Sequence, residues 1–323
     1  MLSSFQSKNM YLGGDKLSTA KKLIIIFLIL LTGIISAVTV YAVRVYFQVE
    51  DVAHSIHRPI EEREEAEVIE NAEPLSLLLL GIANDSRRKT DFRANTIMVA
   101  TLNPATRKTT LTSIPRDAYV EIVGQGYHDK INHAHSFGGA KMMIETVEQY
   151  LDIPIHHYFS LNMDGMADLV DAIGCITVEN EFAFTAEKID YPEGVLDLDG
   201  WEALQYTRMR KDDPEGDYGR QRRQREVTEI LAKELVSLSS VMRIQDLLTI
   251  IGENGETDLT FSQMSQLFIQ YQSALGTVES YQMAGSGFTG DGFRGEYGIS
   301  YQEVTPEEQQ TTSQRLKNEL LID

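Results

Sequence analysis

A cluster of basic residues between Arg208 and Arg225 carries the clearest chemical signal in this sequence. Seven of the chain's 29 Lys and Arg residues fall within this short segment, although the whole chain of 323 residues has a formal net charge of −19. Guanidinium groups stay charged at any working pH and bind phosphate oxygens in a bidentate manner. The cluster therefore predicts a binding site for an anion, and a phosphate fits best.

The spacing within this cluster predicts which side chains face inward. Arg220, Arg223 and Gln224 are three or four residues apart, so they share one face if the segment after Gly219 is helical. Apolar residues, which must turn towards the core, continue this face: Val227, Leu231 and Leu235. We therefore expect Arg220 and Gln224 to point inward at the beginning of the helix, where free backbone amides also favour an anion.

Two further arginines, Arg222 and Arg225, fall on other faces of this helix, and we expect them to be solvated. The segment also fits an alternative in which it is a charged surface helix with Glu–Arg pairs. The local pattern leaves both interpretations open.

Charged side chains also adjoin three predicted strands. Asp85 comes just after the apolar run at 75–81, at a strand end where α/β folds usually bind ligands. A carboxylate there is a candidate Mg²⁺ ligand, since Mg²⁺ prefers one or two carboxylates with phosphate oxygens and water; a turn-forming Asp is the alternative. Arg93 precedes the second predicted strand and Arg116 follows the third. These side chains are expected to meet at one edge of a sheet.

Other chemistries find less support. The five histidines between residues 128 and 157 lack the helical spacing of metal ligands, and no Gly-x-Ser-x-Gly elbow or Walker loop occurs. Cys175, the single cysteine, excludes an intramolecular disulfide, and its apolar surroundings predict a buried structural thiol rather than a nucleophile. The acidic net charge argues against nucleic acid as a partner.

The surrounding sequence alternates between strand and helix patterns. The run at 75–81 predicts a strand buried on both faces, and the segments at 96–102 and 109–114 predict a hairpin. Further predictions are helices at 140–151, 163–173 and 200–207, strands at 155–161 and 175–178, helix from about 240 to 275, a strand at 278–283, a mobile loop with six glycines at 285–298, and a terminal helix from Thr305. This alternation implies a layered α/β domain with a central sheet.

Residues 23–43 form a stretch of 21 residues without a charge, close to the length of about 20 that a helix needs to cross a bilayer. The stretch exceeds the apolar region of a cleaved signal peptide, so we predict a transmembrane helix. Four lysines before it against three arginines after it orient the N-terminus towards the cytoplasm by a small margin. The predicted organisation is a cytoplasmic tail at 1–22, the span at 23–43, an extracytoplasmic stalk at 44–74, a catalytic domain at 75–285 and a C-terminal tail at 286–323.

Several short motifs, taken in order, resemble those of the LytR-CpsA-Psr family. They run from about residue 75 to 235 and read Leu79-Leu-Gly81 with Asp85-Ser-Arg87, Arg93-Ala-Asn-Thr-Ile97, Ser113-Ile-Pro-Arg-Asp117, Asp129-Lys-Ile-Asn-His-Ala134, Phe137-Gly-Gly139, Asn162-Met-Asp-Gly165, and Arg208-Met-Arg210 through Gly216-Asp-Tyr-Gly-Arg220 to Arg223-Gln224. Their order and spacing both fit the family.

The resemblance implies an α/β/α sandwich with a central mixed sheet and a hydrophobic pocket for a polyprenyl chain. It implies a membrane-anchored transferase of Gram-positive type envelopes that moves an anionic glycopolymer, such as wall teichoic acid, from undecaprenyl diphosphate to peptidoglycan through a phosphodiester bond. The expected partners are the lipid-linked polymer, peptidoglycan and the membrane, with no nucleic acid. The expected location is the cell membrane, as a single-pass type II protein with its catalytic domain outside.

The resemblance also assigns roles to single residues. The side chains that would hold the diphosphate are Arg93, Arg116, Arg208, Arg210, Arg220 and Gln224. Asp85 would be an acid associated with Mg²⁺ and would act in catalysis together with Arg116, Arg208 and Arg210; it could instead deprotonate the attacking sugar hydroxyl. Asn95 replaces a second acid of the family, so it keeps an oxygen donor but loses a charge. We therefore expect Mg²⁺ to be held more loosely, chiefly by Asp85 and the substrate's phosphates.

Two other functions remain open at this stage. The domain could be a non-catalytic receptor for polyprenyl phosphates or diphosphates, with Asn95 marking weakened catalysis. It could also be an envelope-linked regulator that attenuates transcription, although the predicted span and the net charge of −19 speak against direct contact with DNA.

Overall fold

The computed structural model describes residues 19–60, 69, 71–84, 90–235, 243–293 and 295–322. The chain divides into two compact units, Met1–Phe47 and Gln48–Asp323. Helix α1 (Thr19–Ile56) provides the described part of the first unit, and its segment Phe27–Ile56 is long and apolar enough to cross a membrane. A helix therefore occupies the described part of the predicted span at 23–43.

The second unit begins inside α1, in the segment that was expected to be a stalk. Ala53 and Ile56 are buried, and His57 forms a bridge to Thr257 in a strand of the sheet. Spacing of three or four residues between apolar positions gives a helix a stripe that can pack on a domain, which explains this difference. Most of the Glu-rich part of the expected stalk, residues 61–68, lies outside the described residues.

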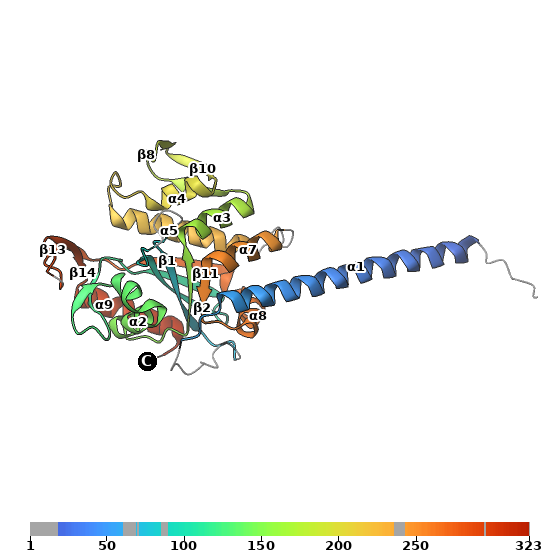
Figure 1. The fold of residues 1–323 in the computed structure, drawn as a ribbon, viewed down its shortest axis with the longest axis horizontal. Helices are drawn as coiled ribbons and strands as arrows, with labels where there is room; N and C mark the ends of the chain where they lie inside the picture. Colours follow the sequence, from blue (N-terminus) through green and yellow to red (C-terminus); the bar gives the residue numbers. More distant parts are fainter. Residues whose placement is uncertain are drawn as a thin grey trace, which may run out of the picture. The chain divides into compact units, whose positions relative to one another are not determined.

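A six-stranded mixed sheet forms the centre of the second unit (Figure 1), as predicted. The strand order is β11-β6-β1-β2-β3-β12, with β1 at Leu75–Ile82, β2 at Ala94–Asn103, β3 at Lys108–Ser113, β6 at His157–Asn162, β11 at Gly255–Thr257 and β12 at Thr277–Gln282. Strand β1 runs antiparallel to β2 and parallel to β6. The predicted buried strand is thus central, and the predicted hairpin is β2–β3.

Helices cover both faces of this sheet (Figure 1), which gives the expected α/β/α sandwich. Helices α2 (His133–Leu151) and α9 (Pro306–Leu320) lie on one side, and their apolar residues join those of β1 in the main core. Helices α3 (Met163–Ile173), α4 (Gly200–Arg208) and α5 (Asp217–Leu235) lie on the other side.

A second apolar core lies among α3, α4, α5 and a group of short strands. These strands are β7 (Ile176–Asn180), β8 (Phe184–Ala186), β9 (Ile189–Tyr191) and β10 (Gly194–Leu198). The buried members of this core come from the helices and short strands and not from β1, β2 or β3. The helices on this side therefore have a core of their own, beside the one that packs on the sheet.

The C-terminal third of the chain differs from its predicted elements. Instead of continuous helix, it contains α7 (Ile244–Asn254), β11, α8 (Phe261–Gln270) and a 3₁₀ turn, η1 (Gln272–Gly276). The predicted mobile loop at 285–298 contains strand β13 (Ser286–Gly290), which pairs with β14 (Ile299–Glu303). Glycine disfavours strands, so the local pattern hid this hairpin.

The predicted terminal helix is present as α9, but it is not a tail. Its Leu316 and Leu320 are buried in the main core, so the C-terminal segment belongs to the same compact unit as the sheet.

Cys175 corrects another expectation. It precedes β7 by one residue and is exposed rather than buried, because the strand begins at Ile176 and Gly174 has left the helix with a φ of 106°.

Candidate functional site

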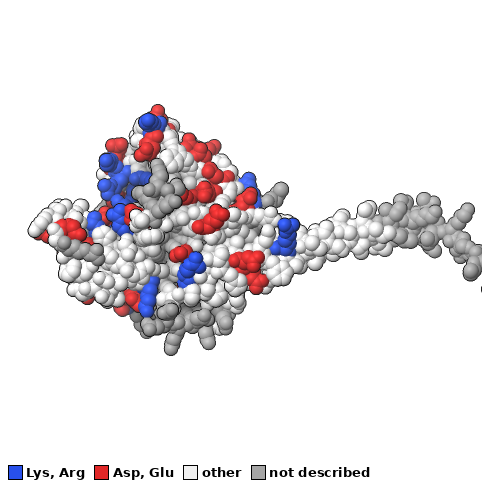
Figure 2. All heavy atoms as spheres, in the orientation of Figure 1, with Lys and Arg blue, Asp and Glu red and all other residues white. Residues whose placement is uncertain are grey.

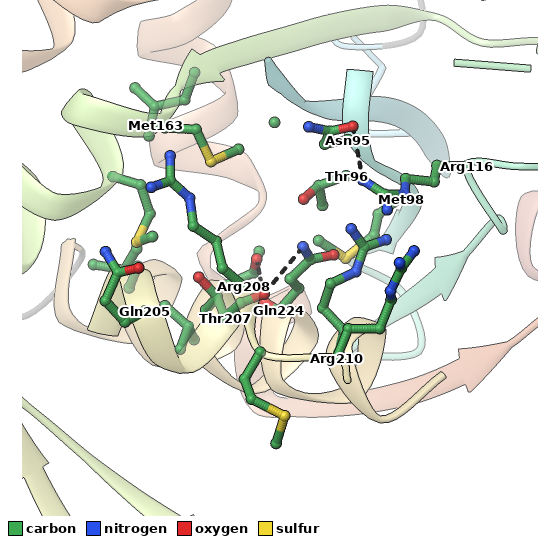
Figure 3. Close-up of a pocket in the computed structure, with 18 of the residues that line it drawn as sticks. Asn95, Thr96, Met98, Arg116, Met163, Gln205, Thr207, Arg208, Arg210 and Gln224 are labelled. Carbon is green, nitrogen blue, oxygen red and sulfur yellow. Dashed lines mark hydrogen bonds between the residues drawn. The ribbon is translucent and has the colours of Figure 1, made fainter. Parts of the chain in front are cut away.

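A cavity of about 700 Å³ lies between the sheet and helices α4 and α5 (Figure 3). Much of its lining is apolar and comes from both sides: Leu79, Met98, Phe159 and Leu161 from the sheet, and Met209, Val227 and Leu231 from the helical side. The rest of the lining is polar and includes most of the residues predicted for the anion site. The cavity can therefore accommodate a ligand that is apolar in one part and anionic in another.

The cationic side chains reach this cavity from two directions. Arg116 follows β3, whereas Arg208 ends α4 and Arg210 lies in the connection to α5. Arg220 and Gln224 come from the first turns of α5 and face the cavity, as their spacing predicted. Figure 2 shows Lys and Arg side chains gathered on the part of the surface near the α4–α5 connection. The alternative of a purely solvated surface helix is therefore wrong.

Arg116 is oriented by the neighbouring strand. Its Nη1 donates a hydrogen bond of 3.0 Å to Oδ1 of Asn95 on β2, and its Nε lies 3.7 Å from the carboxylate of Asp117 (Figure 3). Asn95 thus uses its carbonyl oxygen to hold an arginine. This contact fixes the guanidinium at the edge of the cavity formed by the sheet.

Asp217, the first residue of α5, joins three of the guanidinium groups. Its Oδ2 accepts hydrogen bonds from Arg220 at 3.0 Å and from Gln221 at 3.1 Å. Its Oδ1 lies 3.8 Å from Nη2 of Arg116 and 4.0 Å from Nη1 of Arg210. Oδ1 is buried and has no hydrogen-bond partner within the described part of the chain.

The electrostatics around Arg220 favour an anion. The side chain is only 5% exposed, and burial followed by the charge of Arg116 lowers the pKa of Arg220 to about 10, against the opposing effect of Asp217. A buried cation whose charge is only partly compensated is stabilised when a further negative charge approaches. Arg220 still carries its proton at neutral pH, so it is available to bind a phosphate.

Arg223 also points inward, but it binds the protein itself. Its guanidinium donates to Oδ2 of Asp213 at 2.6 Å, to the carbonyl of Tyr206 at 2.9 Å and to the carbonyl of Met209 at 2.5 Å. A Cβ at position 219 would lie 1.9 Å from the same Asp213 carboxylate, so only glycine fits at this point of α5. This network fixes the connection that carries Arg210.

Arg225 is buried, which contradicts the expectation that it is solvated. It donates hydrogen bonds to Ser113 at 2.9 Å and to Gln282 at 3.1 Å, because α5 packs across strands β3 and β12. Arg222 is more exposed, as expected, and pairs with Glu215 at 2.7 Å.

Of the predicted site residues that the structure describes, Arg93 does not line the cavity. Arg93 is half-exposed and forms two hydrogen bonds, of 2.7 and 2.6 Å, with the carboxylate of Asp91. Asp85 lies outside the described residues, so its predicted role remains a prediction. The structure brings together the other six: Asn95, Arg116, Arg208, Arg210, Arg220 and Gln224.

The described donors do not by themselves fit a Mg²⁺ ion. Among the described residues, no three His, Cys, Asp or Glu side chains are close enough together to hold a metal. The oxygen of Asn95 already accepts from Arg116, and Asp217 is surrounded by guanidinium groups that repel a cation. The expectation of Mg²⁺ therefore rests on Asp85 and on phosphate oxygens.

Sequence reasoning missed Asp217 as a functional residue. It lies three positions before Arg220, a spacing that places both side chains on one face of a helix, and acids are favoured at a helix N-terminus. These two signals could have identified it.

Comparisons with known proteins find relatives over most of this chain. The LytR_cpsA_psr family model matches residues 43–318. A polyisoprenyl-teichoic acid–peptidoglycan teichoic acid transferase, TagU of Enterococcus faecalis, is 42% identical over 306 residues, covering 94% of this chain and 99% of the relative. The crystal structure of Bacillus subtilis TagU is 35% identical with a TM-score of 0.60, covering 77% of this chain and 97% of that one. The structure of TagT bound to LIIa-WTA is 29% identical with a TM-score of 0.66, covering 82% and 100%.

Proposed function

Since this chain belongs to the LytR-CpsA-Psr family, we propose that it transfers an anionic cell-wall glycopolymer from undecaprenyl diphosphate to peptidoglycan through a phosphodiester bond. The observation that carries this proposal is the meeting of four guanidinium groups and a largely apolar lining in one cavity. A polyprenyl diphosphate has the same two parts, an apolar chain and an anionic head.

The cavity supports this donor in size as well as in chemistry. Its volume of about 700 Å³ lies within the range of roughly 300–1,000 Å³ that is usual for ligand sites. Met98, Phe159 and Leu231 would contact the polyprenyl chain, while Arg116, Arg210 and Arg220 would bind the diphosphate oxygens. TagT, a relative with a similar fold, binds a wall teichoic acid ligand, which supports a glycopolymer as the head group.

The reaction would be a phosphoryl transfer. A sugar hydroxyl oxygen of peptidoglycan forms a bond to the phosphorus next to the polymer, the bond from that phosphorus to the bridging oxygen breaks, and undecaprenyl phosphate leaves. The hydroxyl proton passes to a base, for which Asp85 is the candidate. Arg116, Arg208 and Arg210 would neutralise the charge that develops on the phosphate oxygens and on the leaving group. Such neutralisation in a partly enclosed site is stronger than in water.

Two parts of the proposal do not rest on the described lining of the cavity. Mg²⁺, when bound through Asp85 and the donor's phosphates, would neutralise further phosphate charge. The apolar helix α1 would anchor the protein in the cell membrane with the second unit on the outer side, where peptidoglycan is available. This single-pass arrangement matches the lipid-linked donor, whose chain remains in the bilayer.

The test uses the full chain in lipid nanodiscs with a polyprenyl diphosphate-linked glycan, peptidoglycan oligomers and Mg²⁺. Polymer–peptidoglycan product is followed by mass spectrometry. Arg116→Ala and Arg220→Ala should abolish product, whereas Arg222→Ala, which removes an arginine that does not line the cavity, should retain it. Equal activity in all three variants would contradict the proposed site.

One observation favours a second candidate, a receptor that binds the lipid without transferring the polymer. Asn95 carries no charge and its oxygen is held by Arg116. Tight binding of the donor without product, even after Asn95→Asp, would support the receptor and contradict the transferase.

A further inference from the structure

The hairpin formed by β13 and β14 presents several aromatic side chains to solvent. Together with residues of the β4–β5 hairpin, these make up what we call the aromatic hairpin surface: Tyr119, Tyr127, Phe288, Phe293 and Tyr297. Strand β4 is Tyr119–Glu121 and β5 is His128–Lys130. Tyr119 is 41% exposed, Phe293 is 64% exposed and Tyr297 is 84% exposed. Large aromatic rings that remain exposed in a group commonly mark an interaction site.

Four of the five rings on this surface pack against other aromatic rings. Phe293 stacks on Tyr127 with ring centroids 3.7 Å apart and planes only 5° apart. Phe288 and Tyr119 meet edge to face at 5.4 Å, and both contact the buried ring of Tyr301 beneath them. Rings that already pack against one another lose less conformational entropy on binding a partner than freely rotating rings do.

Hydrogen bonds connect the β13–β14 hairpin to residues next to the cationic cavity. The hydroxyl of Tyr218, the residue after Asp217, donates to the carbonyl of Gly285 at 2.7 Å, just before β13 begins. The backbone amide of Gln302 in β14 donates to the carbonyl of Asp117 at 2.8 Å, next to Arg116. The hairpin is thus attached on both sides to residues adjacent to the guanidinium groups.

The hairpin follows one edge strand of the six-stranded sheet, and the segment after α1 pairs with the other edge strand. Directly after α1, His57 forms a bridge to Thr257 in the edge strand β11. The hairpin follows β12, the opposite edge of the same six-stranded sheet, and projects from the body of the unit (Figure 1). With neighbouring strands about 4.8 Å apart, these edges are separated by roughly 24 Å.

The charge of the hairpin argues against the donor polymer. The segment 285–304 contains three acids, Asp291, Glu296 and Glu303, against one arginine. A polyanionic chain would be repelled by this net negative charge, whereas a neutral sugar would not. The apolar faces of sugar rings pack well on aromatic rings, whose bodies are apolar and whose edges tolerate polar neighbours.

From these observations, we propose that the aromatic hairpin surface binds uncharged sugar rings in the glycan strand of the acceptor and leads one of its hydroxyl groups towards the guanidinium cluster. The inference rests on the proposed function for the identity of the acceptor as peptidoglycan. Phe293 and Tyr297, the two most exposed rings, are expected to contribute most of the contact area.

The first measurement is binding alone, which needs no turnover. The full chain in nanodiscs is titrated calorimetrically with uncharged oligomers of N-acetylglucosamine, one of the two sugars of the peptidoglycan strand. Phe293→Ala should weaken binding by roughly five- to tenfold, the range expected for loss of one aromatic stacking contact. Phe268→Ala is the matched control, because Phe268 on α8 is also exposed, at 55%, and lies outside the hairpin. Equal affinity of the two variants for the glycan would overturn the proposal.

The second measurement separates this inference from the proposed function. In the transfer assay, Phe293→Ala should raise KM for the acceptor while KM for the lipid-linked donor stays unchanged. If Phe293→Ala forms product with an unchanged KM for the acceptor, the transferase proposal is supported and the glycan-binding surface is contradicted. Glycan binding that depends on Phe293, without product from the wild type, would support the surface and contradict the transferase. The inference would also be overturned if the protein bound neutral lipid vesicles but not glycan, and if Phe293→Ala weakened that lipid binding.

Discussion

Asp217 accepts a hydrogen bond of 3.0 Å from Arg220, and this contact places a carboxylate at the centre of the cationic site. The second oxygen of the same carboxylate faces Arg116 and Arg210 at 3.8 and 4.0 Å. Asp217 is therefore an internal counter-ion that lets several like charges approach one another before an anionic ligand binds.

Removal of that charge should loosen the site. We expect Asp217→Asn to lower the free energy of unfolding by about 1–3 kcal/mol, the usual range when a charged hydrogen bond is lost and its partner stays buried. Urea unfolding of the full chain measures this change. Asp246→Asn, which changes an exposed acid in the first turn of α7, is the matched control and should have little effect. An equal loss in both variants would indicate a general effect of helix N-termini.

Restoring an acid at position 95 should change the metal requirement. In Asn95→Asp, the new carboxylate adds a negative charge and a second candidate ligand for Mg²⁺, so half-maximal activity should need less Mg²⁺. Arg116 competes for that carboxylate, because its Nη1 already lies 3.0 Å from Oδ1 of Asn95. Activity titrated against Mg²⁺ measures the shift. An unchanged requirement would show that the arginine, and not the ion, takes the added charge.

Two neighbouring arginines on α5 should differ sharply in their effect on stability. Arg223 is buried with Asp213, so Arg223→Ala should destabilise the fold by about 3–5 kcal/mol, since it leaves an unpaired buried carboxylate. Arg222 is 34% exposed, and Arg222→Ala should cost no more than about 1 kcal/mol. Chemical denaturation of both variants tests the contrast. Similar losses would mean that the Asp213 carboxylate is not isolated from water.

Stability should fall in acid through Asp129. Burial opposes the charged form, but hydrogen bonds from His133, the Lys130 amide and Tyr301 outweigh it and lower the pKa of Asp129 below its ordinary value of 3.8. The carboxylate therefore stabilises the fold above pH 3.8, and this contribution is lost as the pH falls through the lowered pKa.

The denaturation midpoint, compared at neutral pH and in acid, should fall for the wild type and fall less for Asp129→Asn. The exposed Asp190 offers a control, and Asp190→Asn should keep the wild-type profile. If the midpoint of Asp129→Asn falls in acid as much as that of the wild type, other carboxylates cause the loss of stability.

The sequence predicted those features that depend on short-range patterns. The apolar run at 75–81 became the central strand β1, the helix at 163–173 has the predicted bounds, and the spacing of Arg220 and Gln224 placed both in the cavity. Local periodicity decides such features because it determines which face of an element is apolar.

Features that depend on distant partners were not predicted. Arg225 is buried because α5 crosses β3 and β12, and the glycine-rich hairpin is held by contacts with the β4 region. Arg93, which its motif assigned to the site, pairs with Asp91 instead. Packing between elements overrides local preference in these places.

Exposure of Cys175 has a practical consequence, because it is the single cysteine of this sequence and lies at the end of α3. A solvent-accessible thiol reacts readily with maleimides, so one fluorophore can be attached without engineering. In intact cells, a maleimide that cannot cross membranes would label this protein only if the second unit faces outward. The same residue therefore provides a direct reporter of which side of the membrane the domain occupies.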